Sequence, residues 1–379
     1  MKNNLIKWCK NCMNMSTRPR ITFDKRGWCN ACQWMEEKKV IDWESRQNTL
    51  RKTLSQFDNG NFKCIVPVSG GKDGSYVSHT IKNKYKINPL TVTVRPALSL
   101  EIGDQNLINF INSGYSHIHI TPNPSILSLL NKLGFIHMGF PYYGWLIAIF
   151  SCLVRTANYY DIKLIIYGED GEVEYGGSNK TKDVPFFDIS YMKKIYTEGG
   201  YDNIIKIAKN KYNVSKEELS FFEFPSEKEI AKKGIKLTHM SYFEPWDSYK
   251  NYLVAKENCG LIEKNEGNKD TFTNFAQNDQ ALYSLHTYLM YLKFGFGRAT
   301  QDCGIEIRRG AMTREQAINL IRMYDNSYPS ENLELYLDYF KMKESEFNSI
   351  IDKYANKNLF NKINNRWEPK FIPGKDFKI

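Results

Sequence analysis

A glycine-rich segment, Ser69–Ser75, follows directly on an apolar run from Phe62 to Val68. Paired glycines after a strand let the backbone turn sharply and approach a ligand closely. A helix-compatible segment comes next, and such a helix directs unpaired N–H groups and its positive dipole end at that ligand. The arrangement predicts a cradle for the phosphates of a nucleotide. Its expected members are Ser69, Gly70, Gly71, Lys72, Asp73, Gly74 and Ser75.

This segment differs from the common phosphate loop, which has four residues between its glycines and a Ser or Thr after its lysine. Asp73 stands in that last place. The run SGGKD resembles instead the pyrophosphate loop of the N-type ATP pyrophosphatases, which split ATP between the α and β phosphates and adenylate a carbonyl oxygen. Their motif is usually written SGGxDS, whereas here Gly74 replaces the last serine and Ser75 follows it. The hydroxyl of Ser69 or of Ser75 could meet phosphate, and an ordinary glycine-rich turn is the alternative interpretation.

Four cysteines near the start of the chain have the spacing of a metal site. They are Cys9-x-x-Cys12, then sixteen residues, then Cys29-x-x-Cys32. Each pair places two thiolates on one side of a tight knuckle, and two knuckles complete a tetrahedron around zinc. Since all four positions are then filled, we expect a structural zinc that supplies the folding free energy of a small segment. An iron–sulfur cluster is the alternative. The remaining cysteines, Cys64, Cys152, Cys259 and Cys303, follow no spacing pattern and are expected to fill apolar sites.

The composition predicts a soluble, cytoplasmic chain with a substantial core. It has 379 residues, 42% of them hydrophobic, which suggests two or three domains. No signal peptide is expected, and the longest apolar run, Trp145–Val154, is about half of what a bilayer crossing needs. The net charge of +10 suits a nucleic acid, or an acidic small substrate together with ATP. Because the lysines are scattered and form no dense basic tract, we do not expect a nucleic-acid partner.

Strand-like and helix-like segments alternate through the middle of the chain, which predicts a parallel sheet with helices on both faces. Ligands of such sheets bind beyond the carboxyl ends of the strands. Three conspicuous segments fall there: Ser69–Ser75, Thr93–Pro96 and Gly168–Glu172. The expected strands are 62–68, 90–94, 117–121 and 163–167, and the expected helices are 75–85, 105–113, 125–133 and 142–160.

From about Asp183 the alternation gives way to mainly helical patterns, with one more strand expected at Lys236–Phe243. We therefore expect three parts. A four-cysteine zinc module spans residues 1–38, an ATP pyrophosphatase α/β core spans 39–182, and a mainly helical region at 183–379 caps the core and completes the site.

Further segments narrow the resemblance to the N-acetyl sugar amidotransferases of the PP-loop superfamily. It is carried over nearly the whole chain by the four-cysteine module, SGGKDGSY, Tyr167–Gly177, the run YFxPW at Tyr242–Trp246, and GFGRAT…IEIRxG…TRE at Gly295–Glu315. These enzymes serve bacterial surface-glycan pathways, including pseudaminic acid modification in flagellated bacteria. The resemblance implies a nucleotide α-hydrolase-like (HUP-type) core. It also implies conversion of a sugar acetamido group to an acetamidino group, through adenylylation of the amide oxygen and attack by ammonia, with release of AMP and pyrophosphate.

The same resemblance implies roles for single residues. Lys72, Asp73 and Glu169 are the expected catalytic residues, with Mg²⁺ near Asp73 and either Glu169 or Asp170. Thr93 and Gly168 are expected to join the nucleotide site. The substrate would be an acidic acetamido sugar, and similar enzymes draw ammonia from a separate glutaminase with a cyclase-like partner. The expected substrate contacts are Arg95, Glu172, Tyr175, Trp246 and Arg298.

Several of these residues also have a purely structural interpretation. Arg95 could hold a substrate carboxylate bidentately or form a salt bridge within the fold. Glu172 could belong to a solvated turn, Trp246 to a packing corner, and Arg298 to a helix cap.

Two other functions are compatible with the sequence. A tRNA-thiolating ATP pyrophosphatase with zinc knuckles would explain the basic charge and the cysteine module together. Such chemistry usually needs cysteines near the nucleotide, and neither Cys64 on its strand nor Cys152 in its apolar helix is expected to lie there. A zinc adaptor or nucleic-acid binder without enzymatic activity is the third class, and it would consume no ATP.

Overall fold

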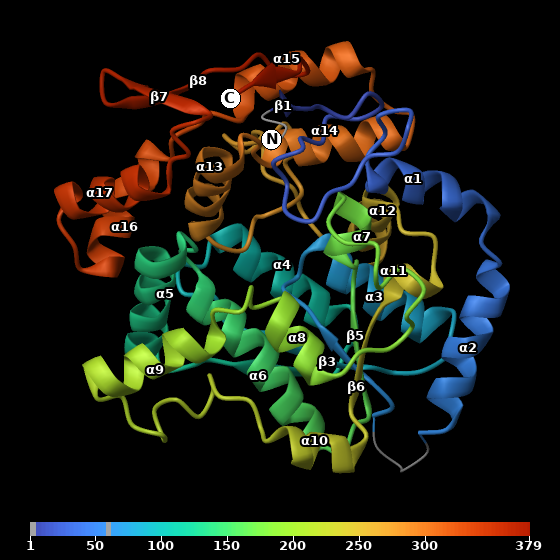
Figure 1. The fold of residues 1–379 in the computed structure, drawn as a ribbon. Coiled ribbons are helices and arrows are strands. Elements are labelled where there is room, and N and C mark those ends of the chain that lie inside the picture. Colours follow the sequence, from blue (N-terminus) through green and yellow to red (C-terminus); the bar gives the residue numbers. More distant parts are fainter. Residues whose placement is uncertain (1–4, 58–61) are drawn as a thin grey trace.

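A five-stranded parallel sheet forms the centre of the protein (Figure 1). The computed structural model describes residues 5–57 and 62–379. Across the sheet the strands lie in the order β4, β3, β2, β5, β6, and every neighbouring pair is parallel. Their bounds are β2 Ile65–Pro67, β3 Leu90–Val94, β4 His117–Ile120, β5 Leu164–Tyr167 and β6 Lys236–His239. The α/β class with a parallel sheet, expected from the sequence, is confirmed.

Helices bury both faces of the sheet. Successive side chains of a strand point to opposite faces, so neighbouring residues of one strand join different cores. Ile65 and Ile165 join one apolar core, whereas Val66 and Ile166 join the other. The first core includes residues of α5 (Pro124–Met138), α6 (Tyr143–Tyr159), α8 (Ile189–Ile195), α9 (Tyr201–Tyr212) and α10 (Glu227–Lys233). The second includes residues of α2 (Trp43–Ser55), α3 (Lys72–Asn83), α4 (Glu101–Asn112), α11 (Met240–Phe243) and α12 (Ser248–Cys259).

The strand order reverses between β2 and β5. From β2 the chain adds β3 and β4 on one side of the sheet, and it later adds β5 and β6 on the other. The loops that leave β2 and β5 therefore diverge, and a crevice opens beyond the carboxyl ends of these two strands. The glycine-rich segment follows β2 and Gly168–Glu172 follows β5, so the topology brings them to the same crevice.

The turn after β2 depends on a glycine with a left-handed backbone. Gly70 has φ of +79°, and a Cβ atom there would lie 2.3 Å from the backbone nitrogen of Leu107 on α4. Helix α3 begins at Lys72, earlier than the expected start at residue 75, with Gly71 as its extended N-cap and no side-chain cap. A Cβ at Gly74 would lie 2.8 Å from the carbonyl oxygen of Pro67, so the serine of the usual motif would collide with β2 here.

The strand expected at Lys236–Phe243 is half as long as predicted. β6 ends at His239, and α11 follows at once because the amide of Ser241 donates to the carbonyl of Gly168 and turns the chain across the end of β5. β6 belongs to the central sheet although it lies beyond residue 183. The division of the chain into three parts at residues 38 and 182 stays a prediction.

The C-terminal third is mainly helical and packs around a third apolar core. That core also takes in Trp8, Met13 and Met15 from the cysteine-rich segment, so the two ends of the chain are packed together. The terminal strands β1 (Leu5–Ile6) and β9 (Phe377–Lys378) pair antiparallel, and both ends lie on one side of the molecule (Figure 1). The other elements are α13 (Leu282–Phe294), α14 (Arg298–Arg308), α15 (Arg314–Tyr324), η2 (Ser330–Asn332), α16 (Leu333–Phe340), α17 (Glu344–Tyr354), β7 (Phe360–Ile363) and β8 (Arg366–Pro369).

Three short helices complete the described elements: α1 (Asn30–Glu37), η1 (Lys38–Val40) and α7 (Gly171–Tyr175). Across residues 5–57 and 62–379, no helix is both long enough and apolar enough to cross a bilayer.

Replacing Gly70 with alanine tests the turn. We expect the free energy of unfolding to fall by about 1–3 kcal/mol, because the new methyl group meets α4 backbone and the φ angle is unfavourable. Gly71→Ala is the matched control, since a Cβ there meets only the hydroxyl of Ser69 at 3.4 Å, and its effect should stay within about 0.5 kcal/mol. Urea titration followed by circular dichroism measures both; equal stability of the two variants would contradict the interpretation.

Candidate active site

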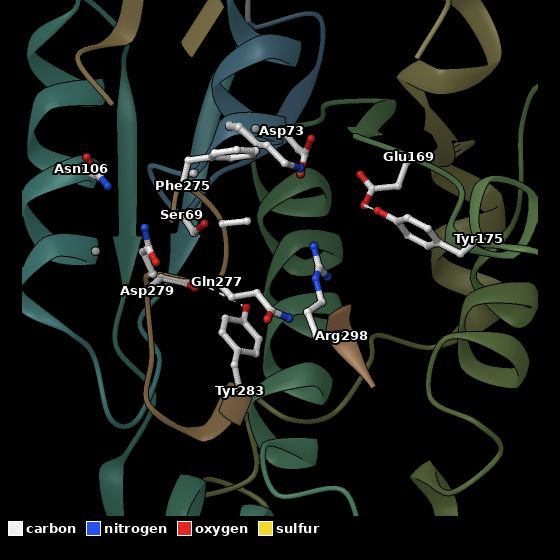
Figure 2. A pocket seen from close by; sticks show the side chains of 16 residues that line it. Ser69, Asp73, Asn106, Glu169, Tyr175, Phe275, Gln277, Asp279, Tyr283 and Arg298 are labelled. Carbon is white, nitrogen blue, oxygen red and sulfur yellow. Dashed lines mark hydrogen bonds and ion pairs between the residues drawn. The ribbon is translucent and has the colours of Figure 1, made fainter. Parts of the chain in front are cut away.

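A cavity of about 250 Å³ lies in the crevice between β2 and β5 (Figure 2). Four parts of the chain enclose it: the loop after β2 with the first turn of α3, the side of α4, the loop after β5 with α7, and a C-terminal portion. The lining residues are Ser69, Gly71, Lys72, Asp73, Gly74, Gly103, Asn106, Glu169, Tyr175, Phe275, Ala276, Gln277, Asn278, Asp279, Tyr283 and Arg298.

Lys72 and Asp73 occupy the first turn of α3, where the free N–H groups of the helix face the cavity. The ammonium group of Lys72 contacts the Asp73 carboxylate, and the lysine is buried. The other carboxylate oxygen of Asp73 accepts a hydrogen bond from Asn251 Nδ2 at 3.4 Å. The loop therefore presents a cation, a carboxylate and a helix N-terminus to one ligand, which suits a phosphate chain that carries a metal ion.

Glu169 and Tyr175 form a hydrogen-bonded pair that lines the cavity together with Asp73 (Figure 2). The Tyr175 hydroxyl donates to Glu169 Oε1 at 2.8 Å. Burial raises the pKa of Glu169, and the negative charge of Asp73 raises it further, while Lys72 and the Tyr175 hydroxyl oppose the rise. A carboxyl group with a raised pKa exchanges protons more readily near neutral pH, so Glu169 can serve as a general base.

Arg298 brings a fixed positive charge into the cavity from the first turn of α14 (Figure 2). Its Nε lies 2.9 Å from Asp302 Oδ1, one helical turn further on. Burial alone would lower the pKa of Arg298, but the Asp302 carboxylate and Tyr175 outweigh it and raise that pKa. Arg298 is therefore charged at all working pH values, and its planar guanidinium suits an anionic group of a substrate.

The segment Phe275–Tyr283 forms one wall of the cavity and was not expected from the sequence, which indicated a helix there. It is held by backbone bonds to the loop after β3: Leu100 N donates to Asp279 O at 3.1 Å, and Ala281 N donates to Leu98 O at 2.9 Å. Burial raises the pKa of Asp279 to about 6. The run of Asn, Gln and Asp before α13 was the available signal, since a loop so rich in amides often binds polar ligands.

Only some of the residues expected to bind nucleotide line the cavity. Gly70 shapes the turn without lining it, and Ser75 lies fully buried inside α3 with its hydroxyl unpartnered among the described atoms. The Thr93 hydroxyl donates to the carbonyl of Val68 at 2.5 Å and so fastens β3 to the loop. Gly168 lies between Asp73 and Trp246, where a Cβ would come within 3.3 Å of the first and 3.1 Å of the second.

The residues expected to bind substrate fall into two groups. Tyr175 and Arg298 line the cavity. Outside it, Arg95 lies 3.6 Å from Asp104 in an exposed ion pair, Glu172 is held by Arg20 at 2.6 Å, and Trp246 packs edge-on against Tyr76. The contacts of Arg95 and Trp246 fit their structural interpretations. Glu172 lies in α7 with only 14% of its side chain exposed, so it does not belong to a solvated turn. The binding of all three residues to substrate stays a prediction.

The four N-terminal cysteines meet in one buried cluster, as the sequence predicted. Their sulfur atoms all lie within 4.8 Å of one another, with separations of 3.5 Å for Cys12–Cys29, 3.6 Å for Cys29–Cys32 and 3.8 Å for Cys9–Cys32. Four sulfurs bound to one zinc at about 2.3 Å in a tetrahedron lie about 3.8 Å apart, so the cluster has the right size. Backbone amides of Asn14 and Cys29 point at two of the sulfurs, which suits thiolate ligands.

The metal site can be tested by elemental analysis and thermal unfolding. We expect the purified chain to carry one zinc ion and Cys12→Ser to lose it, with a lower melting temperature, because a small knuckle has little core of its own. Cys303→Ser is the matched control: this cysteine is equally buried but belongs to another core, and the variant should keep its zinc. Iron in place of zinc, or zinc retained in Cys12→Ser, would contradict the assignment.

Two comparisons with known proteins bear on the chain. Residues 269–371 match the family model described as the C-terminal domain of WbpG-like LPS biosynthesis proteins. An uncharacterised protein of Methanocaldococcus jannaschii is 28% identical over 104 residues, which cover 27% of this chain. That alignment spans 37% of the relative, so the chain matches little more than a third of it.

The matched domain contains Arg298 and the Asn/Gln-rich cavity wall, so it contributes directly to the candidate site. The match associates this part of the chain with bacterial LPS biosynthesis, a pathway of surface glycans.

Proposed function

We propose that the protein is an ATP-dependent, AMP-forming amidotransferase that converts the acetamido group of an acidic sugar into an acetamidino group. The observation that carries the proposal is the position of SGGKD at the point where the strand order reverses, in one cavity with Glu169 and Arg298. This arrangement would make a nucleotide site and a site for an anionic sugar neighbours, and the match to an LPS biosynthesis domain supports a sugar substrate.

The first turn of α3 is the proposed site of the β and γ phosphates. Its free N–H groups and the ammonium of Lys72 would stabilise the charge that builds up on departing pyrophosphate. Mg²⁺ fits this site because Asp73 and Glu169 provide carboxylate oxygens beside the phosphates, and the ion would neutralise phosphate charge. Among the described residues only the four cysteines form a protein-only metal cluster, so Mg²⁺ would take most of its ligands from phosphate and water.

Arg298 is the proposed anchor for the carboxylate of the sugar, and it orients the acetamido group toward the α phosphate. The amide oxygen attacks the α phosphorus, the bond from that phosphorus to the bridging oxygen breaks, and pyrophosphate leaves. Ammonia then adds to the carbon of the O-adenylyl imidate and loses a proton. The bond from carbon to the AMP oxygen breaks, which releases AMP and leaves the acetamidino group.

Glu169 is the proposed acceptor of the proton that the attacking nitrogen loses. It must be ionised to do so, and the hydrogen bond from Tyr175 helps to keep it ionised. The pairing also fixes the direction in which the carboxylate points, because Oε1 accepts the hydrogen bond from the Tyr175 hydroxyl.

Several acidic acetamido compounds satisfy this chemistry. Free or CMP-linked nonulosonic acids of the pseudaminic or legionaminic type and UDP-linked diacetamido uronic acids each carry the amide and the anionic group that the cavity would bind. We propose that ammonia comes from a separate glutaminase together with a cyclase-like subunit.

The positions of the cysteines do not favour sulfur transfer to tRNA. Burial raises the pKa of Cys64 and of Cys152 to about 12, so neither thiol ionises readily. All eight cysteines are described, and none of them lines the cavity.

The reaction products provide the direct test. With ATP, an ammonium salt and a diacetamido sugar acid, we expect AMP and pyrophosphate, and mass spectrometry should show NH in place of the carbonyl oxygen. Lys72→Ala should lower kcat about 10²–10³-fold and Glu169→Gln about 10²–10⁴-fold. Lys52→Ala, on an exposed face of α2, should match the wild type. Formation of ADP, or AMP formation that does not depend on the sugar, would rule out the proposed reaction.

The pH dependence of kcat/KM tests the Glu169–Tyr175 pair. Because the Tyr175 hydroxyl stabilises the carboxylate, Tyr175→Phe should raise the pKa of Glu169 and move the acid side of the profile to higher pH. Tyr159→Phe, at an exposed tyrosine, should leave the profile in place. If the acid side does not move in Tyr175→Phe, another group controls the protonation step.

A further inference from the structure

The cysteine-rich module is packed directly against the short helix that carries Tyr175. Helix α7 runs from Gly171 to Tyr175 and is followed by Gly176 and Gly177. The Arg20 guanidinium holds Glu172 through two bonds of 2.6 and 2.7 Å, and the Asn30 amide donates to the carbonyl of Gly177. Figure 1 shows α1 and α7 beside each other at this contact. The module therefore forms the outer support of one wall of the cavity.

Glu174 is a second anchor of this contact. Its carboxylate accepts hydrogen bonds from Trp34 Nε1 at 2.8 Å and from Lys38 Nζ at 2.7 Å, and the ion pair with Lys38 is almost fully buried. A buried carboxylate that accepts one hydrogen bond from an ammonium group and one from an indole N–H is costly to displace. The backbone immediately before Tyr175 thus cannot shift without breaking these bonds.

Asn14 connects a zinc ligand to Tyr175 through one side-chain amide. Its Nδ2 donates to Cys29 Sγ at 3.3 Å and to the carbonyl oxygen of Tyr175 at 3.0 Å, and the residue is 3% exposed. The knuckle also fixes the backbone of Asn14, because Asn14 N points at Cys12 Sγ at 3.4 Å and Asn14 O accepts from Cys9 N at 2.7 Å.

The opposite side of this contact is equally restricted. Gly176 has φ of +91°, and a Cβ there would lie 2.7 Å from Asn14 Nδ2. The close approach of α7 to Asn14 therefore needs a residue without a side chain.

We propose that Asn14 is a positioning residue through which the four-cysteine centre fixes Tyr175, and with it Glu169, in the cavity. A zinc-bound thiolate is a strong acceptor and holds one N–H of the amide, so the other N–H is aimed at Tyr175. When the knuckle folds around the metal, it places Asn14, Asn14 places the end of α7, and the Tyr175 hydroxyl places Glu169. The role of Glu169 in this inference rests on the proposed function. The connection from the cysteine cluster through Asn14 to Tyr175 does not depend on that function.

Asn14→Leu removes both donors at similar volume, and Gln33→Leu is its matched control, since the Gln33 amide donates only within the module, to Trp28 O. We expect Asn14→Leu to keep its zinc, to lower kcat about 10–100-fold and to leave KM for ATP within about twofold. Amide hydrogen exchange should accelerate at residues 171–177 in this variant and not in Gln33→Leu. Chelating zinc from the wild type should cause the same local loss of protection, with β3 still protected.

Gly176→Ala disturbs the contact from the α7 side, and no residue of the module itself is replaced. This variant therefore tests the proposal in the case where Asn14→Leu loses its zinc. Zinc retained with lowered kcat in Gly176→Ala supports the proposal. Wild-type kcat and wild-type protection of residues 171–177 in both variants overturn it. If the wild type forms no sugar-dependent AMP, the proposed function fails, but the exchange measurements still decide whether zinc positions α7.

Discussion

The site depends on the divergence of the loops that follow β2 and β5. Parallel strands end at the same edge of a sheet, and a reversal of strand order leaves the space between two of these ends uncovered. Gly70 makes that space usable, because only a residue without a side chain lets the loop turn against α4 and point α3 into the crevice. The N-terminus of α3, Asp73 and Glu169 meet for this reason, although nearly a hundred residues separate the two carboxylates in sequence.

The crevice becomes a lined pocket only through contacts of high sequence separation. The segment Phe275–Tyr283 forms one of its walls by pairing with the loop after β3, and α14 adds Arg298 to the lining. The half of the site that we propose for the nucleotide belongs to the sheet, whereas the half proposed for the sugar belongs largely to the C-terminal region. Such a division would allow one ATP-activating core to act on different acceptors, since a separate part of the chain would select the acceptor.

The cysteine-rich module provides a third kind of constraint. Helix α7 is only five residues long and cannot be stable alone, so its position depends on what surrounds it. Asn14, Arg20 and Lys38 hold it from one side, and the side chain of Arg308 donates to the carbonyl of Glu174 from the C-terminal region. A knuckle held by the expected metal would be a suitable support for a short helix, because the metal would add stability that the small apolar cluster of the segment could not supply.

The sequence alone determined the features that residues close together in the chain produce. The cysteine spacing determined the four-cysteine cluster, the apolar runs determined the parallel sheet, and the glycines after β2 determined a sharp turn into a helix. Tertiary structure decided which polar residues reach the cavity. Arg95, Glu172 and Trp246 lie outside the cavity lining and contact other residues of the fold, while Gln277 and Asp279 line the cavity without a motif. Spacing along a chain specifies a turn or a knuckle. Which residues far apart in the sequence come into contact depends on how the helices and loops pack.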